Sequence, residues 1–235
     1  MLLLSLVKLA GPLLLSFLED LVSRLSRDGG TWLRTTLGTA AAVDPFTSAF
    51  AGASRHVGRS AIAVTPDDVA ELRGLGVTWS LARWAVDDLA RAALLVRASD
   101  VLDASSLQAV VDRAYRNGDT RERQAILRAL PLLPYPERTL ALAIEAARAG
   151  VPPVFEAIAC ENPYPAAHFP AMNFNHMVLS ALLTGVALQR IVSLGARVTP
   201  ELVRVVNDWV AERRAAGRSV PADLDYIADA TRAAA

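Results

Sequence analysis

The chain has 235 residues with 24 basic and 24 acidic side chains and one cysteine, Cys160. This length suits one large core. The zero net charge gives no general support to nucleic-acid binding, and a lone cysteine excludes an intramolecular disulfide framework. We therefore expect a soluble, cytoplasmic protein without a nucleic-acid partner. Because 53% of the residues are hydrophobic and only 6% are aromatic, the apolar content is mainly Ala, Leu and Val, which favours packed helices.

The first segment, residues 1–27, begins with the apolar run MLLLSLVKLA. Lys8 and the Gly11-Pro12 pair interrupt the run before it reaches the roughly 20 apolar residues that span a bilayer. It also lacks the charged start and the small-residue cleavage site of a signal peptide. Apolar residues then recur at helical spacing at Leu14, Phe17, Leu18, Leu21, Val22 and Leu25. We predict an amphipathic helix that packs on the domain, with a peripheral membrane contact or a signal sequence as alternatives.

Residues 28–64 show the least periodicity. Asp28-Gly29-Gly30 stops the helical pattern, and the residues that follow are rich in Gly, Thr, Ala and Ser. We expect an irregular linker or loop region here. His56 lies in it between Arg55 and Arg59, a basic patch that could meet an anionic group, although such loop charges are usually solvated.

Residues 65–220 carry regular helix signals. Thr65-Pro66 supplies an N-cap followed by proline at the first helical position, and Asp119 with Glu122 has the spacing of a capping box. Further starts are predicted at Pro136, Pro152 and Thr199, and stops at Gly74, Gly118, Gly150 and Gly217. No run alternates convincingly with period two. We predict an all-α fold with at least half of the residues in helix and no sheet of three or more strands.

The short turns between these helices favour stacked antiparallel helix pairs, as in HEAT-like or other α-solenoid proteins. No strict repeat is visible, so a compact helical domain remains an alternative. Within the helix that carries Leu81, Ala85, Leu89, Ala92 and Val96 inward, Asp87 and Arg91 are spaced to pair on its solvent side. The expected divisions are thus residues 1–27, 28–64, 65–220 and a C-terminal tail, 221–235.

The chemical character concentrates between Glu161 and His176. Three prolines between residues 163 and 170 should hold the backbone in rigid extended turns and fix nearby polar side chains with little ordering cost. On the helix that begins near Met172, residues 173, 176, 180 and 184 share one face, opposite an inward stripe of Phe174, Met177 and Val178. The candidate ligand-binding residues are Asn162, Tyr164, His168, Phe169, Asn173, His176 and Ser180. The alternative is a solvated stripe and a plain proline-braced connection.

Motifs of catalysis and metal binding are missing from the sequence. The two histidines of this segment do not have His-Glu-x-x-His spacing, and there is no phosphate loop, dinucleotide fingerprint or Gly-x-Ser-x-Gly elbow. We therefore expect no metal and no cofactor. Cys160 follows an apolar helix and is interpreted as a buried small residue. If the chain is catalytic, the candidates for proton transfer are His168, His176 and Glu161.

Several ordered motifs resemble the EboA family. They run from Leu130-Pro131-Leu132-Leu133-Pro134-Tyr135-Pro136-Glu137-Arg138 through Val154-Phe155-Glu156-Ala157-Ile158-Ala159 to Glu161-Asn162-Pro163-Tyr164-Pro165, then His168-Phe169 and Asn175 with Met177-Val178-Leu179, and end with Ala211-Glu212-Arg213-Arg214-Ala215-Ala216-Gly217-Arg218. The resemblance covers about residues 50–220. The chain departs from the family pattern at His176, where Gln is usual, and at Ser180, where Lys is usual, which suggests a different ligand or task.

The resemblance implies a metabolite-traffic protein, encoded beside a prenyltransferase and other enzymes, that helps to move prenylated or otherwise hydrophobic secondary metabolites. The first functional hypothesis is therefore a binding protein for a hydrophobic small-molecule metabolite, with other proteins of the same pathway as further partners. The second is a cofactor-independent isomerase or cyclase acting on such a metabolite. The third is a scaffold for pathway enzymes.

Overall fold

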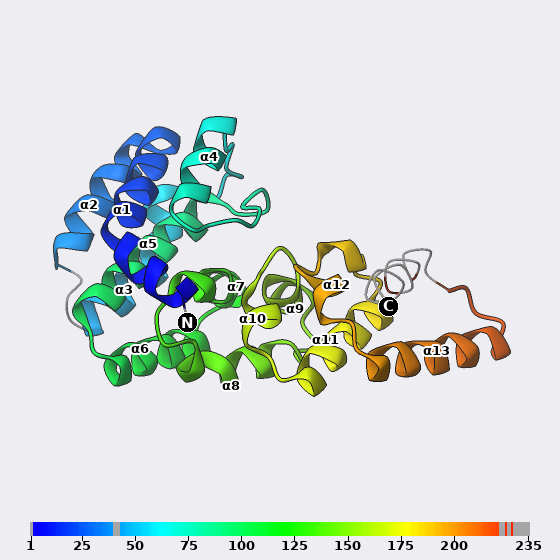
Figure 1. Cartoon of the computed structure of the whole chain (residues 1–235). Coiled ribbons are helices and arrows are strands. Elements are labelled where there is room, and N and C mark those ends of the chain that lie inside the picture. The colour runs from blue at the N-terminus through cyan, green and yellow to red at the C-terminus, as the bar shows by residue number, and fades with distance from the viewer. Residues whose placement is uncertain (1, 40–42, 221–223, 225–226, 228–235) are drawn as a thin grey trace. The chain divides into compact units, whose positions relative to one another are not determined.

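The computed structural model describes residues 2–39, 43–220, 224 and 227. It is 75% helical, and in the described residues no sheet forms beyond an isolated bridge between Ala61 and Ala85. The predicted all-α fold is confirmed, with packed helices along the whole described chain (Figure 1). The helices form two compact units, Met1–Leu142 and Ala143–Ala235, a division that the sequence pattern did not predict.

The first unit is built around one central helix, α5. Its helices are α1 (Leu2–Leu25), α2 (Arg27–Thr39), α3 (Val43–Val57), α4 (Pro66–Gly74), α5 (Val86–Val101), α6 (Ala104–Asn117) and α7 (Thr120–Ala129), followed by the 3-10 turn Leu130–Leu132. Helix α5 contacts α1, α2, α3, α6 and α7. Every residue of α5 from Val86 to Val96 is buried, so this helix has no solvent side over three turns.

The expectation of an irregular region over residues 28–64 was wrong for most of its length, because α2 and α3 lie there. Gly29 and Gly30 are buried inside the first turn of α2. A Cβ atom on Gly30 would lie 2.6 Å from the Cα atom of Ser23 in α1, and one on Gly29 would lie 2.9 Å from the Cα atom of Val57. These glycines therefore allow close approach of the helix backbones. In the sequence the two adjacent glycines resembled a helix end, because glycine occurs both where helices end and where helices pack closely.

The Asp87–Arg91 pair forms as predicted, but its placement on the solvent side was wrong. Arg91 NH1 donates to Asp87 Oδ2 over 2.7 Å, and both residues are buried, at 1% and 0% exposure. Arg121 of α7 adds a second contact, NH2 to Asp87 Oδ1 at 2.6 Å, and Arg91 Nε donates to the carbonyl oxygen of Phe50 in α3 at 3.0 Å. The carboxylate of Asp87 thus joins α5 to α7 and, through Arg91, to α3.

Asp88, the next residue, makes its own buried contacts. Its Oδ2 atom accepts from Arg128 NH1 at 2.6 Å and from the backbone N–H of Ala85 at 2.8 Å, which caps the start of α5. Burial raises the pKa of Asp88, although Arg128 opposes the rise. For Asp87, burial also acts to raise the pKa, but the hydrogen bonds from Arg121 and Arg91 outweigh it and the pKa is lowered. We call Asp87, Asp88, Arg91, Arg121 and Arg128 the buried charge network.

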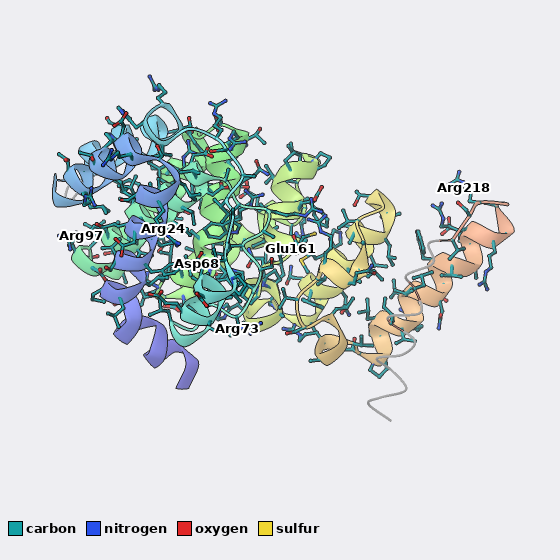
Figure 2. The ribbon with its side chains drawn as sticks, turned by 90° about the horizontal axis from the view of Figure 1, so that it is seen from above. Arg24, Asp68, Arg73, Arg97, Glu161 and Arg218 are labelled. Atoms are coloured by element: carbon teal, nitrogen blue, oxygen red, sulfur yellow. The ribbon has the colours of Figure 1, made fainter. Side chains whose placement is uncertain are left out.

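The predicted caps are confirmed. Thr65 and Asp68 form a capping box at α4, and Asp119 and Glu122 form one at α7. Asp68 also pairs with Arg24 near the end of α1, which ties α4 to α1 (Figure 2).

Helix α8 (Pro136–Ala146) contains the division between the units. The second unit continues with α9 (Pro152–Ala159), α10 (Tyr164–His168), α11 (Ala171–Thr184), the 3-10 turn Leu188–Arg190, α12 (Leu194–Arg197) and α13 (Pro200–Ala215). The Thr199 side chain caps α13. Gly185 adopts φ 74° and ends α11, and Leu188 and Ile191 after it are buried. Of the expected tail, residues 221–235, only 224 and 227 lie within the described part.

Among the described helices, none is long and apolar enough to cross a membrane.

Candidate functional site

The turn after α9 is built by Asn162. Its side chain is buried, and Nδ2 donates to the carbonyl oxygen of Ala157 at 2.9 Å while Oδ1 accepts from the backbone N–H of Tyr164 at 3.0 Å. An asparagine side chain that bonds the backbone two residues later stabilises a turn. The Asn162 side chain therefore stabilises the turn that connects α9 to α10.

Glu161 precedes this turn and adopts the left-handed conformation, with φ 49°. A non-glycine residue in that region carries a conformational cost, which a specific contact must offset. Arg190 makes this contact. Its Nε and NH2 groups donate to Oε1 and Oε2 of Glu161 at 2.8 and 3.0 Å. In return, the backbone N–H of Glu161 donates to the carbonyl oxygen of Arg190 at 2.8 Å. A third donation, from NH1, reaches Glu156 in α9 at 2.7 Å. The hydrogen bonds that Arg190 donates to Glu161 and to Glu156 raise the pKa of Arg190.

The proline-rich segment is partly helical, which corrects the expectation of extended turns throughout. Pro163 takes a helical conformation as the N-cap of α10, and Pro165 lies in the first turn. Proline is tolerated there because the first N–H groups of a helix have no partner within the helix. The short helix turns the Tyr164 and His168 rings toward each other, with centroids 4.7 Å apart, and Phe169 meets Tyr164 edge to face at 6.4 Å. Tyr164 and Phe169 are buried and His168 is half-buried.

Arg197 of α12 contacts the end of α10 and the start of α11. Its NH1 and NH2 groups donate to the carbonyl oxygens of Ala166 and Phe169, the latter at 2.7 Å, and its guanidinium lies 4.7 Å above the Phe174 ring. These contacts satisfy backbone acceptors at the end of α10 and stabilise the turn into α11. Arg190 and Arg197 were not predicted as site residues, because nothing in the linear pattern pairs them with residues about thirty positions earlier.

The outward face of α11 carries the remaining candidates. The inward residues Phe174, Met177 and Val178 are buried as predicted. On the outer side, Asn173 and Ser180 are half-buried and His176 is exposed. Two large apolar residues that sequence analysis did not single out, Met172 and Leu183, are 73% and 65% exposed. We call Met172, Asn173, His176, Ser180 and Leu183 the outward face of α11.

The structure therefore divides the predicted site residues into two groups. Tyr164, His168 and Phe169 form one ring group beside the Asn162 turn, whereas Asn173, His176 and Ser180 lie along α11. The ring contacts of the described residues do not include His176, so His168 and His176 are separate features in this arrangement.

Comparison with known proteins gives one match. A family model described as the metabolite traffic protein EboA covers residues 13–228, and no curated protein or solved structure matches the chain. The match extends the resemblance seen in the sequence to the second half of α1, to α2 and to the start of α3. Because it covers nearly the whole chain, the protein belongs to the EboA family of metabolite traffic proteins.

Proposed function

We propose that this member of the family binds a hydrophobic metabolite, such as a prenylated compound, on the outward face of α11 and carries it without converting it. The observation that carries the proposal is the exposure of Met172 and Leu183 on that face. The two residues are eleven positions apart, about three helical turns, so they lie on one side of the helix with His176 between them. Large exposed apolar side chains grouped with a few polar ones are typical of ligand or partner surfaces.

Binding without chemistry is supported by the contacts of Glu161, one of the three candidates for proton transfer, and of the neighbouring Asn162. Both carboxylate oxygens of Glu161 accept hydrogen bonds from Arg190, and the Asn162 amide bonds the backbone on both sides. A general base needs a lone pair directed at the substrate proton. These hydrogen bonds support a structural role for Glu161 and Asn162. His176, which lies exposed on the outward face of α11, then remains the titratable group that would contact a ligand there.

The test is incubation of the purified protein with a panel of prenylated aromatic compounds, followed by mass spectrometry of what stays bound and what is released. We expect retention of at least one compound with unchanged mass and unchanged chromatographic retention. The double variant Met172→Gln/Leu183→Gln should retain less, while Val101→Gln, a partly exposed apolar residue of the first unit, should retain as much as the native protein. A released isomer would instead support an isomerase or cyclase, and no retention at all would leave the scaffold hypothesis.

His176 gives the finer test on the same face. Because its side chain is exposed, His176→Ala should change the free energy of unfolding by no more than about 0.5 kcal/mol, yet it should weaken retention of the compound. His176→Gln restores the usual family residue, and an amide can replace the imidazole as a hydrogen-bonding group. Retention by the Gln variant would therefore indicate an orienting hydrogen bond. Unfolding of both variants would exclude His176 from the binding surface.

A further inference from the structure

We propose that a peroxide oxidises Met172 to its sulfoxide and that this modification releases the metabolite from the outward face of α11. The inference rests on the proposed function and adds a regulation of that same surface. It begins from two methionines of one helix that differ in exposure. Met172 is 73% exposed, whereas Met177 is 0% exposed. Because the oxidant must touch the sulfur atom, a peroxide in solution reaches Met172 and is kept from Met177 by the surrounding core.

The reaction needs only the thioether and the peroxide. A lone pair of the Met172 sulfur attacks one oxygen atom of hydrogen peroxide, the O–O bond breaks, and the other oxygen atom leaves as hydroxide. The hydroxyl group now on sulfur gives its proton to that hydroxide, which yields the sulfoxide and water. Sulfur loses two electrons and the peroxide gains them. Methionine sulfoxide reductases reverse the change with a dithiol, which becomes a disulfide while the oxygen atom leaves as water.

The fold tolerates the added oxygen atom at Met172. With the residue 73% exposed, the sulfoxide oxygen stays in water, so the reaction buries no polar group. On Met177 the same oxygen atom would enter the buried stripe of α11 beside Phe174 and Val178. Oxidation of Met172 therefore changes the chemistry of a surface and leaves the packing of the helix intact.

The sulfoxide changes one of the two large apolar side chains of the outward face of α11. These are Met172 and Leu183, and of the two only Met172 contains sulfur. A metabolite that covers the oxidised side chain must strip water from the sulfoxide oxygen, and an apolar ligand offers no hydrogen bond in return. A contact that favoured binding is replaced by one that opposes it. The affinity for an apolar ligand should therefore fall about tenfold or more.

A second effect concerns His176, which lies exposed four positions after Met172. Residues four positions apart are neighbours on a helix surface, with Cβ atoms about 5–6 Å apart. A sulfoxide oxygen accepts hydrogen bonds and an imidazole N–H donates them. A hydrogen bond between the two side chains would occupy the polar group that the proposed function assigns to the ligand. Oxidation thus acts on both the apolar and the polar part of this face.

The experiment treats the purified full-length protein with increasing amounts of hydrogen peroxide. Tandem mass spectrometry measures the sulfoxide at Met172 and at Met177, and retention of a prenylated phenol is measured on the same samples. We expect Met172 to be oxidised at least about tenfold faster than Met177, with an unchanged circular dichroism spectrum. Retention should fall about tenfold when Met172 is fully oxidised. Methionine sulfoxide reductases with dithiothreitol should restore both the thioether and the retention.

Two variants isolate the effect of the sulfur atom. Met172→Leu has an apolar side chain without sulfur; its retention before treatment is its own reference, and peroxide should leave that value unchanged. Met172→Leu/Leu183→Met moves the thioether to a position that is 65% exposed on the same face, and peroxide should again lower its retention.

The outcomes separate this inference from the proposed function. Retention that survives full oxidation of Met172, equal oxidation rates of Met172 and Met177, or an equal loss in peroxide-treated Met172→Leu would overturn the inference and leave the proposed function standing. An untreated native protein that retains no prenylated phenol would overturn the proposed function, and the inference with it.

Discussion

Three buried charged residues, Asp87, Asp88 and Arg91, lie in α5. Asp87 and Arg91 are both withdrawn from water, and each depends on the other and on further donors and acceptors from α3 and α7. A buried ion pair contributes little net stability compared with an apolar pair, but loss of one partner leaves the other charge without compensation. The buried charge network therefore acts mainly to determine which helices pack against α5 and how each is rotated about its own axis.

Arg91→Met tests this interpretation. Since Asp87 would lose its most buried partner, we expect the free energy of unfolding, measured by urea denaturation, to fall by about 3–5 kcal/mol. The control is Arg204→Met on α13, whose pairs with Glu201 and Asp208 are exposed to solvent and should leave the unfolding curve unchanged. Equal curves for Arg91→Met and the native protein would show that Arg121 alone compensates Asp87.

A pH dependence follows from Asp103, the N-cap of α6. Hydrogen bonds from Ser105 and Ser106 lower the pKa of this exposed carboxyl to about 2. The ordinary pKa in the unfolded chain is about 3.9. A lowered folded-state pKa contributes stability that is present above the unfolded value and is lost as the pH falls through the folded value. Asp103→Asn keeps a good capping group but does not titrate, so its thermal midpoint should fall less than that of the native protein between about pH 4 and pH 2. Parallel midpoint curves would contradict the assignment.

At the scale of helices, the contact of α1 with α2 depends on glycine. A methyl group at Gly30 would come within 2.2 Å of Ser23 Oγ and 2.6 Å of its Cα atom, and the backbone cannot move aside as a flexible side chain could. Gly30→Ala should therefore lower the free energy of unfolding by about 1–3 kcal/mol, as overpacked cores do. Gly38→Ala, in the same helix but with nothing within 4 Å, should be neutral or slightly stabilising because alanine is the better helix former. Similar effects of the two substitutions would mean that α2 does not pack this closely on α1.

Much of the helix pattern could be predicted from sequence, but the packing could not. The caps at Thr65, Asp119 and Thr199 are local, because each side chain bonds a backbone group within three residues, and they were found. The same local reasoning placed Arg91 in solvent, since helical spacing cannot show that neighbours enclose a helix on every side. At the candidate site, the inward stripe of α11 was predicted from its period, whereas Arg190 and Arg197 act across about thirty residues and carry no local signal.

Across the whole molecule, burial is distributed very unevenly. Helix α5 is buried without interruption from Val86 to Val96, whereas Leu202 and Val206 are the buried residues of α13. Amides in well-buried helices open mainly with the global unfolding of their unit, and amides in sparsely packed helices open locally. In hydrogen–deuterium exchange followed by mass spectrometry, peptides from α5 should be among the slowest to exchange and peptides from α13 among the fastest. Early exchange of α5 would show that the buried charge network is not rigid in solution.

Cys160, between α9 and the Asn162 turn, is the chain's single cysteine and is 4% exposed. A thiol reagent can reach it only when the surrounding structure opens, and the labelling rate then reports that opening on a timescale set by reagent concentration. Cys160 is thus a natural probe next to the segment that Arg190 and Arg197 contact. Slower labelling in the presence of a bound metabolite would measure, without any engineered probe, how far ligand binding and the closing of this segment are coupled.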